Sequence, residues 1–360
     1  MPPFSPTPPP DTPSTRLTAL PSLVRIKPGA LDRAGIYLQR HSYTRLAIFH
    51  SQGFDLALRQ RLRLALTSAG GDILLDTPVE SIDFQHATHL FKQLPKGIEA
   101  IIGFGGGRAL DVAKTVASLA SLPFFAIPTS LSNDGFCSPQ SSLTHHGRRQ
   151  AYPTPVPFGV ILDTAVCLGA PAHLWHSGIG DLAAKFTAVT DWKLAFHATG
   201  TPVDDFAALL SDASVYQFIA NPAHDLAGTK LLGSALLFNG IAMSIAGSSR
   251  PASGSEHLIS HSLDSLSARP RLHGLQVGVA TYLVSLLQMQ NSAIIADLFT
   301  RTGFWHAIAG DPFDRAEWEE ALRIAPSLKE NFHTILSVKD SLPAALKLLT
   351  SDPFLRPCFG

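Results

Sequence analysis

A glycine-rich turn at residues 103–107 is the part of the sequence whose residue types point most directly to chemistry. Gly103, Gly105, Gly106 and Gly107 follow a short apolar run and precede a helical pattern. Glycines let a backbone approach a ligand closely, and the start of a helix offers free N–H groups and a positive dipole end to an anion. The spacing fits neither GxGxxG nor GxxxxGK[ST]. The turn therefore predicts a pyrophosphate site in an α/β protein, with a plain tight turn as the alternative.

A polar loop further along the chain strengthens this prediction. Residues 124–128 form another short apolar run, which ends in Pro128-Thr129-Ser130. Asn133, Asp134 and Gly135 follow it. A second junction of this kind, next to the glycine turn, makes a bound ligand the favoured interpretation.

A second candidate site lies in the later part of the chain and combines one carboxylate with two imidazoles. Asp181 follows Gly178 and Gly180, and His257 and His273 come much later. These side chains form a ligand set for Zn²⁺, Fe²⁺ or Ni²⁺ that leaves positions open for water or substrate. His261 lies four residues after His257 and shares its helix face. Three alternatives stay open: Asp181 as a helix N-cap, core histidines, and a chance cluster among 15 histidines.

The elements that must hold these residues differ between the two parts of the chain. Between about residues 22 and 165, apolar runs alternate with helical patterns; the runs lie at 23–26, 45–50, 71–76, 99–104, 123–128 and 158–163, and the helical patterns at 54–69, 86–94 and 107–121. Such alternation predicts a parallel sheet covered on both faces. From about residue 168 onward, long Ala/Leu-rich segments with helical spacing replace the runs.

The predicted fold class is therefore an α/β N-terminal Rossmann-like nucleotide domain followed by an all-α C-terminal domain. We expect a disordered proline-rich tail at residues 1–21, the nucleotide domain at 22–167 and the helical domain at 168–360. The cleft between two such domains is the default place for an active site.

Composition excludes several function classes. Lys and Arg together number 28, as do Asp and Glu, so the formal net charge is zero and nucleic acid is not an expected partner. We find no apolar run of the roughly 18 residues that a membrane span needs, so no membrane partner is expected. The three cysteines are scattered, which fits a reducing compartment, and we expect the protein in the cytoplasm.

Several motifs, in order, resemble the sn-glycerol-1-phosphate dehydrogenases. This family belongs to the superfamily that also holds iron-containing alcohol dehydrogenases, glycerol dehydrogenase and 3-dehydroquinate synthase. The resemblance covers roughly residues 22–340 and rests on GFGGGRALDVAK, PTSLSNDGFCSP, GVILDT, GIGDLAAKFTAVTDW, SGSEHLISHSLD and HGLQVGVAT. The dehydroquinate synthases carry a different segment in place of residues 132–137, which disfavours the cyclase.

The resemblance implies a role for each candidate residue. Gly105, Gly106, Gly107 and Asp111 would hold the cofactor pyrophosphate, while Thr129, Ser130 and Ser132 would line the cofactor. Asp181, His257 and His273 would bind one divalent metal in a dehydroquinate synthase-like helical domain, with Zn²⁺ expected and Ni²⁺ or Fe²⁺ as alternatives. Asp134 and His261 would face the substrate as candidate proton donors, and Lys185 would face it as well.

The implied reaction is the NAD(P)H-dependent, metal-dependent reduction of dihydroxyacetone phosphate to sn-glycerol 1-phosphate, or its reverse. The alternatives are a dehydrogenase of another polyol or polyol phosphate, a dehydroquinate synthase-like cyclase, and a non-catalytic relative. The partners expected are a small phosphorylated substrate and further copies of the chain, in a homodimer or larger homo-oligomer.

The chain departs from the family pattern at two places. Leu275 replaces a glutamate that the family usually has after His-Gly, and Phe332-His333-Thr334-Ile335-Leu336 replaces Arg-Tyr-Thr-Ile-Leu. A phosphate needs basic partners, and the basic residues near the motifs are Arg148, Arg149, Lys185 and Arg250, each of which could equally be a solvated surface charge.

Cofactor choice depends on the end of the run at 45–50. An acidic residue at such a position hydrogen-bonds the ribose 2′-hydroxyl of NAD and repels the 2′-phosphate of NADP. Here the run continues into His50-Ser51-Gln52-Gly53, with no carboxylate and no arginine clamp. We therefore expect NADPH to be accepted at least as well as NADH.

Overall fold

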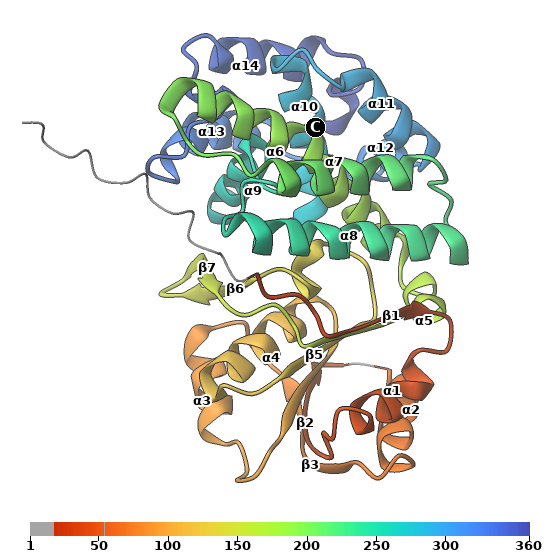
Figure 1. Cartoon of the computed structure of the whole chain (residues 1–360). Helices are drawn as coiled ribbons and strands as arrows, with labels where there is room; N and C mark the ends of the chain where they lie inside the picture. The colour runs from red at the N-terminus through yellow and green to blue at the C-terminus, as the bar shows by residue number, and fades with distance from the viewer. Residues whose placement is uncertain (1–17, 54) are drawn as a thin grey trace, which may run out of the picture.

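The computed structural model describes residues 18–53 and 55–360 (Figure 1). Most of the tail expected at residues 1–21 therefore lies outside the described residues. At the start of the described chain, the carbonyl of Ala19 accepts a hydrogen bond from Ser244 Oγ at 2.9 Å.

A six-stranded parallel sheet forms the first half, as the alternating pattern predicts. Its strand order is β1-β8-β5-β4-β2-β3. Each predicted run is a strand, within three residues at either end: β1 (Leu23–Lys27), β2 (Arg45–Ser51), β3 (Asp72–Val79), β4 (Ala100–Gly105), β5 (Phe124–Pro128) and β8 (Gly159–Asp163). The central strands are apolar because helices bury both of their faces.

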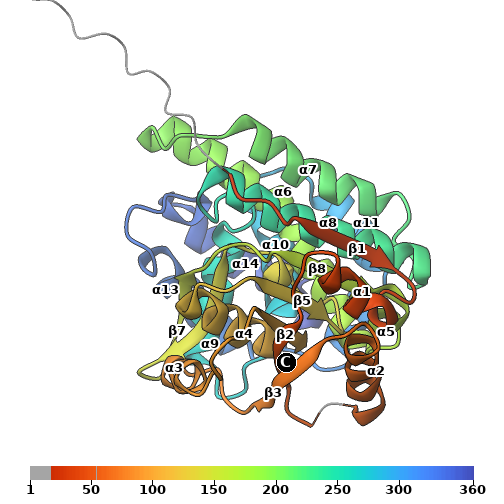
Figure 2. The same cartoon turned by 60° about the horizontal axis from the view of Figure 1, so that its bottom comes forward.

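The covering helices explain the two separate apolar clusters of the sheet half. On one face lie η1 (Leu31–Arg33), α1 (Ala34–Gln39) and α2 (Leu56–Thr67), and on the other α3 (Phe84–Lys92) and α4 (Gly107–Ala120) (Figure 2). Leu62 and Leu66 of α2 pack against Ile48 on the first face. Leu110 of α4 and Phe49 of β2 belong to the cluster on the second face.

The strand order places a ligand position between β2 and β4. The chain leaves β2 for β3 on one side and returns to β4 on the other, so the connections diverge at this point. In open α/β sheets, ligands bind beyond the carboxyl ends of the strands at such a divergence. Ser51 and Gly105, the last residues of β2 and β4, flank this position.

A hairpin that the sequence patterns did not predict separates β5 from β8. The polar loop after β5 contains η2 (Asp134–Phe136), and β6 (Gln140–His145) then pairs with β7 (Arg148–Pro153) in an antiparallel ribbon. This ribbon reaches up to the helical half and contacts α9 (Figure 1).

The second half is helical, as predicted. It contains α5 (Thr164–Leu168), α6 (Ala172–Thr199), α7 (Asp205–Ile219), α8 (Leu226–Ala246), α9 (Ser255–Leu266), α10 (His273–Leu287), α11 (Ser292–Arg301), α12 (Phe304–Ala309), α13 (Arg315–Ile324), α14 (Ser341–Ser351) and the short turns η3 (Ala325–Ser327), η4 (Ile335–Ser337) and η5 (Arg356–Cys358). The helices stack above the sheet, and α8 runs along the border (Figure 1). The domain boundary at residues 167 and 168 stays a prediction.

The sequence expectation about membrane spans was wrong in one respect. Among the described residues, α8 is long and apolar enough to cross a membrane by length and composition. Some 56% of its most apolar window is buried inside the protein. An apolar helix with this burial is also what the core of a large protein requires.

Candidate active site

Three distant segments bring Asp181, His257 and His273 together. Asp181 lies inside α6, His257 in the first turn of α9, and His273 at the first position of α10. One ligand atom from each lies within 4.8 Å of the others. Asp181 is not a helix N-cap, because α6 begins nine residues earlier at Ala172 with Pro171 as its cap. That alternative is therefore excluded.

Glycines beside the triad allow this meeting. A Cβ atom on Gly180 would lie 2.0 Å from the carbonyl oxygen of Gly274, and one on Gly274 would lie 1.9 Å from the carbonyl oxygen of Ser177. Helices α6 and α10 therefore touch through their backbones at this point, which only glycine permits. Because Gly180 precedes Asp181 and Gly274 follows His273, the contact sets the two side chains next to each other.

Each histidine of the triad is oriented by a partner on its Nδ1 atom. His257 Nδ1 lies 2.9 Å from Glu256 Oε1, and His273 Nδ1 lies 3.1 Å from Ser260 Oγ. The Nε2 atoms approach Asp181 Oδ1, at 3.5 Å for His257 and 3.9 Å for His273. Partners of this kind fix the ring orientation of histidines that bind metals.

Leu275, where the family pattern has a glutamate, points into the apolar core and is 8% exposed. The neighbouring Gln276 accepts a hydrogen bond from Ser260 Oγ at 2.9 Å, so Ser260 bridges Gln276 and His273. Ser260 and the side-chain amide of Gln276 therefore orient the ring of His273 without a carboxylate at position 275.

Electrostatics within the triad favour an anionic Asp181 beside a cation. Burial opposes ionisation of Asp181, but Lys185 and His257 outweigh it and lower the pKa of its carboxyl. Burial likewise opposes protonation of His257, but hydrogen bonds to Asp181 and Glu256 raise its pKa. Burial and His257 together lower the pKa of His273 to about 3.

Lys185 is the buried cation of this centre. Its Nζ lies 3.2 Å from Asp134 Oδ2, 4.0 Å from Asp181 Oδ2 and 3.1 Å from the carbonyl oxygen of Ala252. Burial alone would lower the pKa of Lys185, but Asp181 and Asp134 outweigh it and raise the pKa. The charge of Lys185 is thus matched by two carboxylates, and its expected contact with a substrate stays a prediction.

Asp134 and His261 lie beside the triad. The backbone N–H of Asp134 donates to Asp181 Oδ2 at 3.0 Å, and burial together with Asp181 raises the pKa of the Asp134 carboxyl. The ring centroid of His261 lies 5.8 Å from that of His273 and 6.3 Å from that of His257. Burial and these two histidines lower the pKa of His261 well below its usual range.

A cavity of about 310 Å³ joins these groups and includes residues of both halves. Its walls hold Asp134 and the triad, together with His261, Asp111, Arg149 and Lys329. Asp111 lies on α4 and is nearly buried, and burial raises its pKa to about 6. The structure thus places Asp111 at this cavity, although the sequence resemblance assigned it to the pyrophosphate loop.

Lys114 fastens the loop after β5 to α4. Its Nζ donates to the carbonyl oxygens of Gly135 at 2.7 Å, Ser138 at 3.0 Å and Gln140 at 2.6 Å. Gly135 lies inside η2, Ser138 follows it, and Gln140 is the first residue of β6. Lys114 therefore holds the segment that carries Asp134.

The glycine turn lies at the strand divergence beside this cavity. Gly105 has a φ of +135°, and a Cβ atom there would lie 2.2 Å from Ser51 Oγ. The N–H of Gly106 donates to Ser51 Oγ at 3.1 Å, whereas a Cβ on Gly106 would meet no atom within 4 Å. The turn therefore leaves open space in front of the first residues of α4, where an anion can approach.

The remaining cofactor candidates lie next to the turn. The N–H of Thr129 donates to the carbonyl oxygen of Gly105 at 3.0 Å, which joins the ends of β4 and β5. Ser130 and Ser132 are partly buried, and the carbonyl oxygen of Ser132 accepts from Ser177 Oγ at 2.8 Å. Asn133, which sequence reasoning did not assign, lies 3.5 Å from the Cβ position of Gly107.

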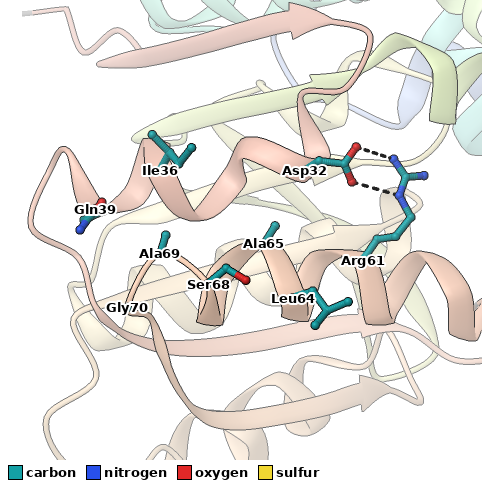
Figure 3. Close-up of a pocket in the computed structure, with 9 residues that line it drawn as sticks. All are labelled: Asp32, Ile36, Gln39, Arg61, Leu64, Ala65, Ser68, Ala69 and Gly70. Atoms are coloured by element: carbon teal, nitrogen blue, oxygen red, sulfur yellow. Dashed lines mark hydrogen bonds and ion pairs between the residues drawn. The ribbon is translucent and has the colours of Figure 1, made fainter.

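A second and more open hollow of about 680 Å³ lies far from these residues, between α1 and α2 (Figure 3). Its only charged residues are Asp32 and Arg61, which pair with each other at 3.0 Å. Its other lining residues are apolar, small or amide side chains. It offers no group for catalysis, so the smaller cavity with the triad is the candidate active site.

Comparisons with known proteins identify the family of this chain. The family model described as iron-containing alcohol dehydrogenase matches residues 25–171. A glycerol-1-phosphate dehydrogenase (NAD(P)+) from Aeropyrum pernix is 34% identical over 333 residues, covering 89% of this chain and 93% of that protein. One from Methanosarcina acetivorans is 36% identical over 245 residues, covering 67% and 68%. This chain belongs to the glycerol-1-phosphate dehydrogenase family.

Solved structures confirm the fold class of this family member. A probable glycerol dehydrogenase from Sinorhizobium meliloti matches with a TM-score of 0.74 at 19% identity, covering 95% of this chain and 99% of that one. A sulfoacetaldehyde reductase from Bifidobacterium kashiwanohense, solved in complex with NAD+, matches with a TM-score of 0.67 at 17% identity, covering 93% and 98%. At such identities the likeness establishes the fold.

Proposed function

We propose that this protein reduces dihydroxyacetone phosphate to sn-glycerol 1-phosphate with NAD(P)H, or runs the reverse oxidation, and that it needs one divalent metal. The observation that carries the proposal is the meeting of Asp181, His257 and His273 in a cavity beside the glycine turn. Curated relatives with the same activity name support the choice of substrate.

The residues of the triad fit a divalent metal of the Zn²⁺, Fe²⁺ or Ni²⁺ type. One carboxylate oxygen and two Nε2 atoms converge, and both Nδ1 atoms are already engaged by Glu256 and Ser260. Zn²⁺ accepts three protein ligands of this kind and keeps a further position open in catalytic sites. When bound, such an ion polarises a carbonyl group and stabilises the negative charge that develops on its oxygen.

The chain's own residues supply positioning and a proton. The glycine turn would hold the cofactor pyrophosphate, and the nicotinamide of the bound cofactor would supply the hydride. Asp134 and His261 are the groups that we propose to hold the proton for the product hydroxyl, at Asp134 Oδ or at a ring nitrogen of His261. Lys185 keeps the Asp134 and Asp181 carboxylates in place through its Nζ.

The test is NADPH oxidation, followed at 340 nm with metal-loaded protein and dihydroxyacetone phosphate. We expect one NADPH consumed per sn-glycerol 1-phosphate formed, and chiral analysis of the product identifies the enantiomer. A cyclase would return its cofactor unchanged, so it would give no net oxidation. Absence of net oxidation with this substrate, in protein that holds metal and cofactor, would refute the proposal.

We also propose that the protein works in the cytoplasm as a homo-oligomer. Phe206, Leu209 and Tyr216 on α7 are 63%, 64% and 53% exposed and share one helix face, which is a costly arrangement for an isolated chain. Light scattering on the purified protein should give a mass at least twice that of the chain, and Leu209→Glu should lower it. A monomeric wild type would contradict this proposal.

A further inference from the structure

We infer that Arg149 and Lys329 form the subsite that holds the phosphate group of the substrate. This inference rests on the proposed function and assigns the recognition of the phosphate to two residues from separate parts of the chain. Arg149 comes from β7 of the hairpin, and Lys329 follows η3. Both line the cavity that contains the triad.

Neither cation forms an ion pair with a carboxylate of the residues that the structure describes. Asp111 and Asp264 line the same cavity and interact with Arg149, but at distances longer than the 4.0 Å of an ion pair. Arg149 Nε donates to Ser142 Oγ at 2.7 Å, and Lys329 Nζ donates to Ser249 Oγ at 3.4 Å. These hydroxyl contacts orient the two groups, and neither contact supplies a negative charge.

The other basic residues near the cavity are already committed. Lys185 is matched by Asp134 and Asp181. Arg250 is 5% exposed, lies with its guanidinium 3.6 Å from the ring centre of Phe332, and donates to the carbonyl oxygen of His333 at 2.8 Å. Of the Lys and Arg residues that the structure describes, Arg149 and Lys329 are the ones that line this cavity, and neither forms an ion pair within 4.0 Å.

Lys329 is also held in place beside a second cation. Its Nζ lies 4.4 Å from the ring centre of Phe332, the same ring that stacks on Arg250. Burial and the nearby Arg250 charge lower the pKa of Lys329. Two cations that share one ring raise the local positive potential, and an anion bound beside Lys329 would lower it.

The two cations lie in the same cavity as the groups that we propose to act on the substrate. Arg149 and Lys329 share its lining with Asp134, His261 and the triad. A phosphate dianion suits such a pair, since the planar guanidinium binds two phosphate oxygens and the ammonium adds a point charge. Dihydroxyacetone has the same ketone but no phosphate, so it would gain nothing from either residue.

The experiment compares two substrates in variants of the metal-loaded enzyme. For Lys329→Gln and Arg149→Gln, we measure kcat/KM with dihydroxyacetone phosphate and with dihydroxyacetone. We expect the ratio of the two values to fall by about tenfold or more in each variant, as for loss of a hydrogen bond to a charged group. The lower ratio should result from a higher KM for dihydroxyacetone phosphate, with kcat little changed.

Arg148→Gln is the matched control. Arg148 precedes Arg149 in β7, so its side chain points to the other face of the ribbon, and it does not line the cavity. The substrate ratio should therefore stay unchanged in this variant. An unchanged ratio in both test variants, or an equal loss with both substrates, would overturn the inference.

Failure of the proposed function would be recognised separately. If the wild type oxidises no NADPH with dihydroxyacetone phosphate, calorimetric titration with inorganic phosphate still tests the subsite. Binding that is lost in Lys329→Gln and Arg149→Gln but kept in Arg148→Gln supports it. Absence of phosphate binding to the wild type, or equal binding by all variants, overturns it.

Discussion

The sheet half and the helical half of this protein hold their functional groups in different ways. In the sheet half, the proposed cofactor site is built from backbone: Gly106 leaves space in front of α4, and Gly105 adopts a φ that excludes other residues. In the helical half, the proposed metal site is built from three side chains, which come from α6, α9 and α10.

This difference has a physical cause. A pyrophosphate spans several atoms and is satisfied by consecutive N–H groups at one strand-to-helix junction. A metal ion needs three or four ligands that converge on one point, which a single short segment rarely supplies. Cofactor binding should therefore depend on local chain geometry, and metal binding on the packing of distant helices. Single mutations should then impair cofactor binding without loss of the metal, or metal binding without loss of the cofactor.

The largest expected effect is that of His257→Ala. Removing one of three ligands should abolish stoichiometric metal and lower turnover by about a thousandfold or more. The Kd for NADPH should change little, because the glycine turn is untouched. Metal analysis by mass spectrometry and a fluorescence titration with NADPH measure both quantities on one sample. A variant that keeps full metal and activity would contradict the assignment of His257.

His261→Ala should have a smaller effect on rate and none on metal content. A residue that handles a proton contributes about a hundredfold or more to the rate. Metal content and kcat are measured together, with His257→Ala as the comparison. If His261→Ala loses the metal as completely as His257→Ala does, the centre has four protein ligands and His261 is one of them.

Gly106→Val tests the backbone side of the comparison. No atom lies within 4 Å of the Cβ position and φ is −83°, so valine fits without unfolding the protein. It fills the space where the pyrophosphate should lie, and the Kd for NADPH should rise tenfold or more, which corresponds to about 1.4 kcal/mol. An unchanged Kd for NADPH in folded Gly106→Val protein would contradict the assignment of the turn as the pyrophosphate site.

Gly105→Ala is the contrasting variant at the neighbouring position. Its Cβ would lie 2.2 Å from Ser51 Oγ, at a φ of +135°. We therefore expect a lower melting temperature for Gly105→Ala, measured by calorimetry, whereas that of Gly106→Val should stay near the wild-type value.

The smallest effect concerns the choice of nicotinamide cofactor. The sequence gives no carboxylate after β2, but the structure places Asp76 of β3 with Oδ1 3.5 Å from His50 Nε2. Asp76 forms ion pairs with Arg59, at 3.0 Å, and with Arg63, so we do not expect it to hydrogen-bond the ribose of the cofactor. We still expect NADPH to be accepted at least as well as NADH. A preference for NADH above about tenfold, measured as kcat/KM, would contradict this.

The sequence predicted the elements with strong local signals. All six strands of the sheet and the start of α4 at Gly107 agree with the apolar runs and the glycine turn. The short helix α1 was missed because Gly35 lies inside it and weakens its helical pattern. That glycine is required by packing, since a Cβ there would lie 2.0 Å from the carbonyl oxygen of Ala65 in α2.

The hairpin of β6 and β7 was missed because its strands are polar and partly exposed. Its turn did carry a signal in the sequence, because Gly147 follows His146 between the two polar strands. In the structure both residues have positive φ values, of 50° and 73°, as in two-residue hairpin turns. The hairpin matters for function, since it supplies Arg149 to the cavity.

The site was predictable only in part. Residue types and motif resemblance assembled the triad, but no local pattern could show that Gly180 and Gly274 bring α6 and α10 into contact. Nor could the sequence show which cations are already paired. Lys185 and Lys329 carry the same charge. Only the packed structure shows that Lys185 forms ion pairs with two carboxylates, whereas Lys329 forms none among the described residues.

The most direct test of the three-segment metal centre is an anomalous diffraction map from crystals of the Zn²⁺-loaded protein, recorded at the zinc edge. We predict one peak per chain, roughly 2.0–2.2 Å from Asp181 Oδ1, His257 Nε2 and His273 Nε2. A peak held by other residues, or no peak near these three atoms in crystals of active protein, would contradict the account.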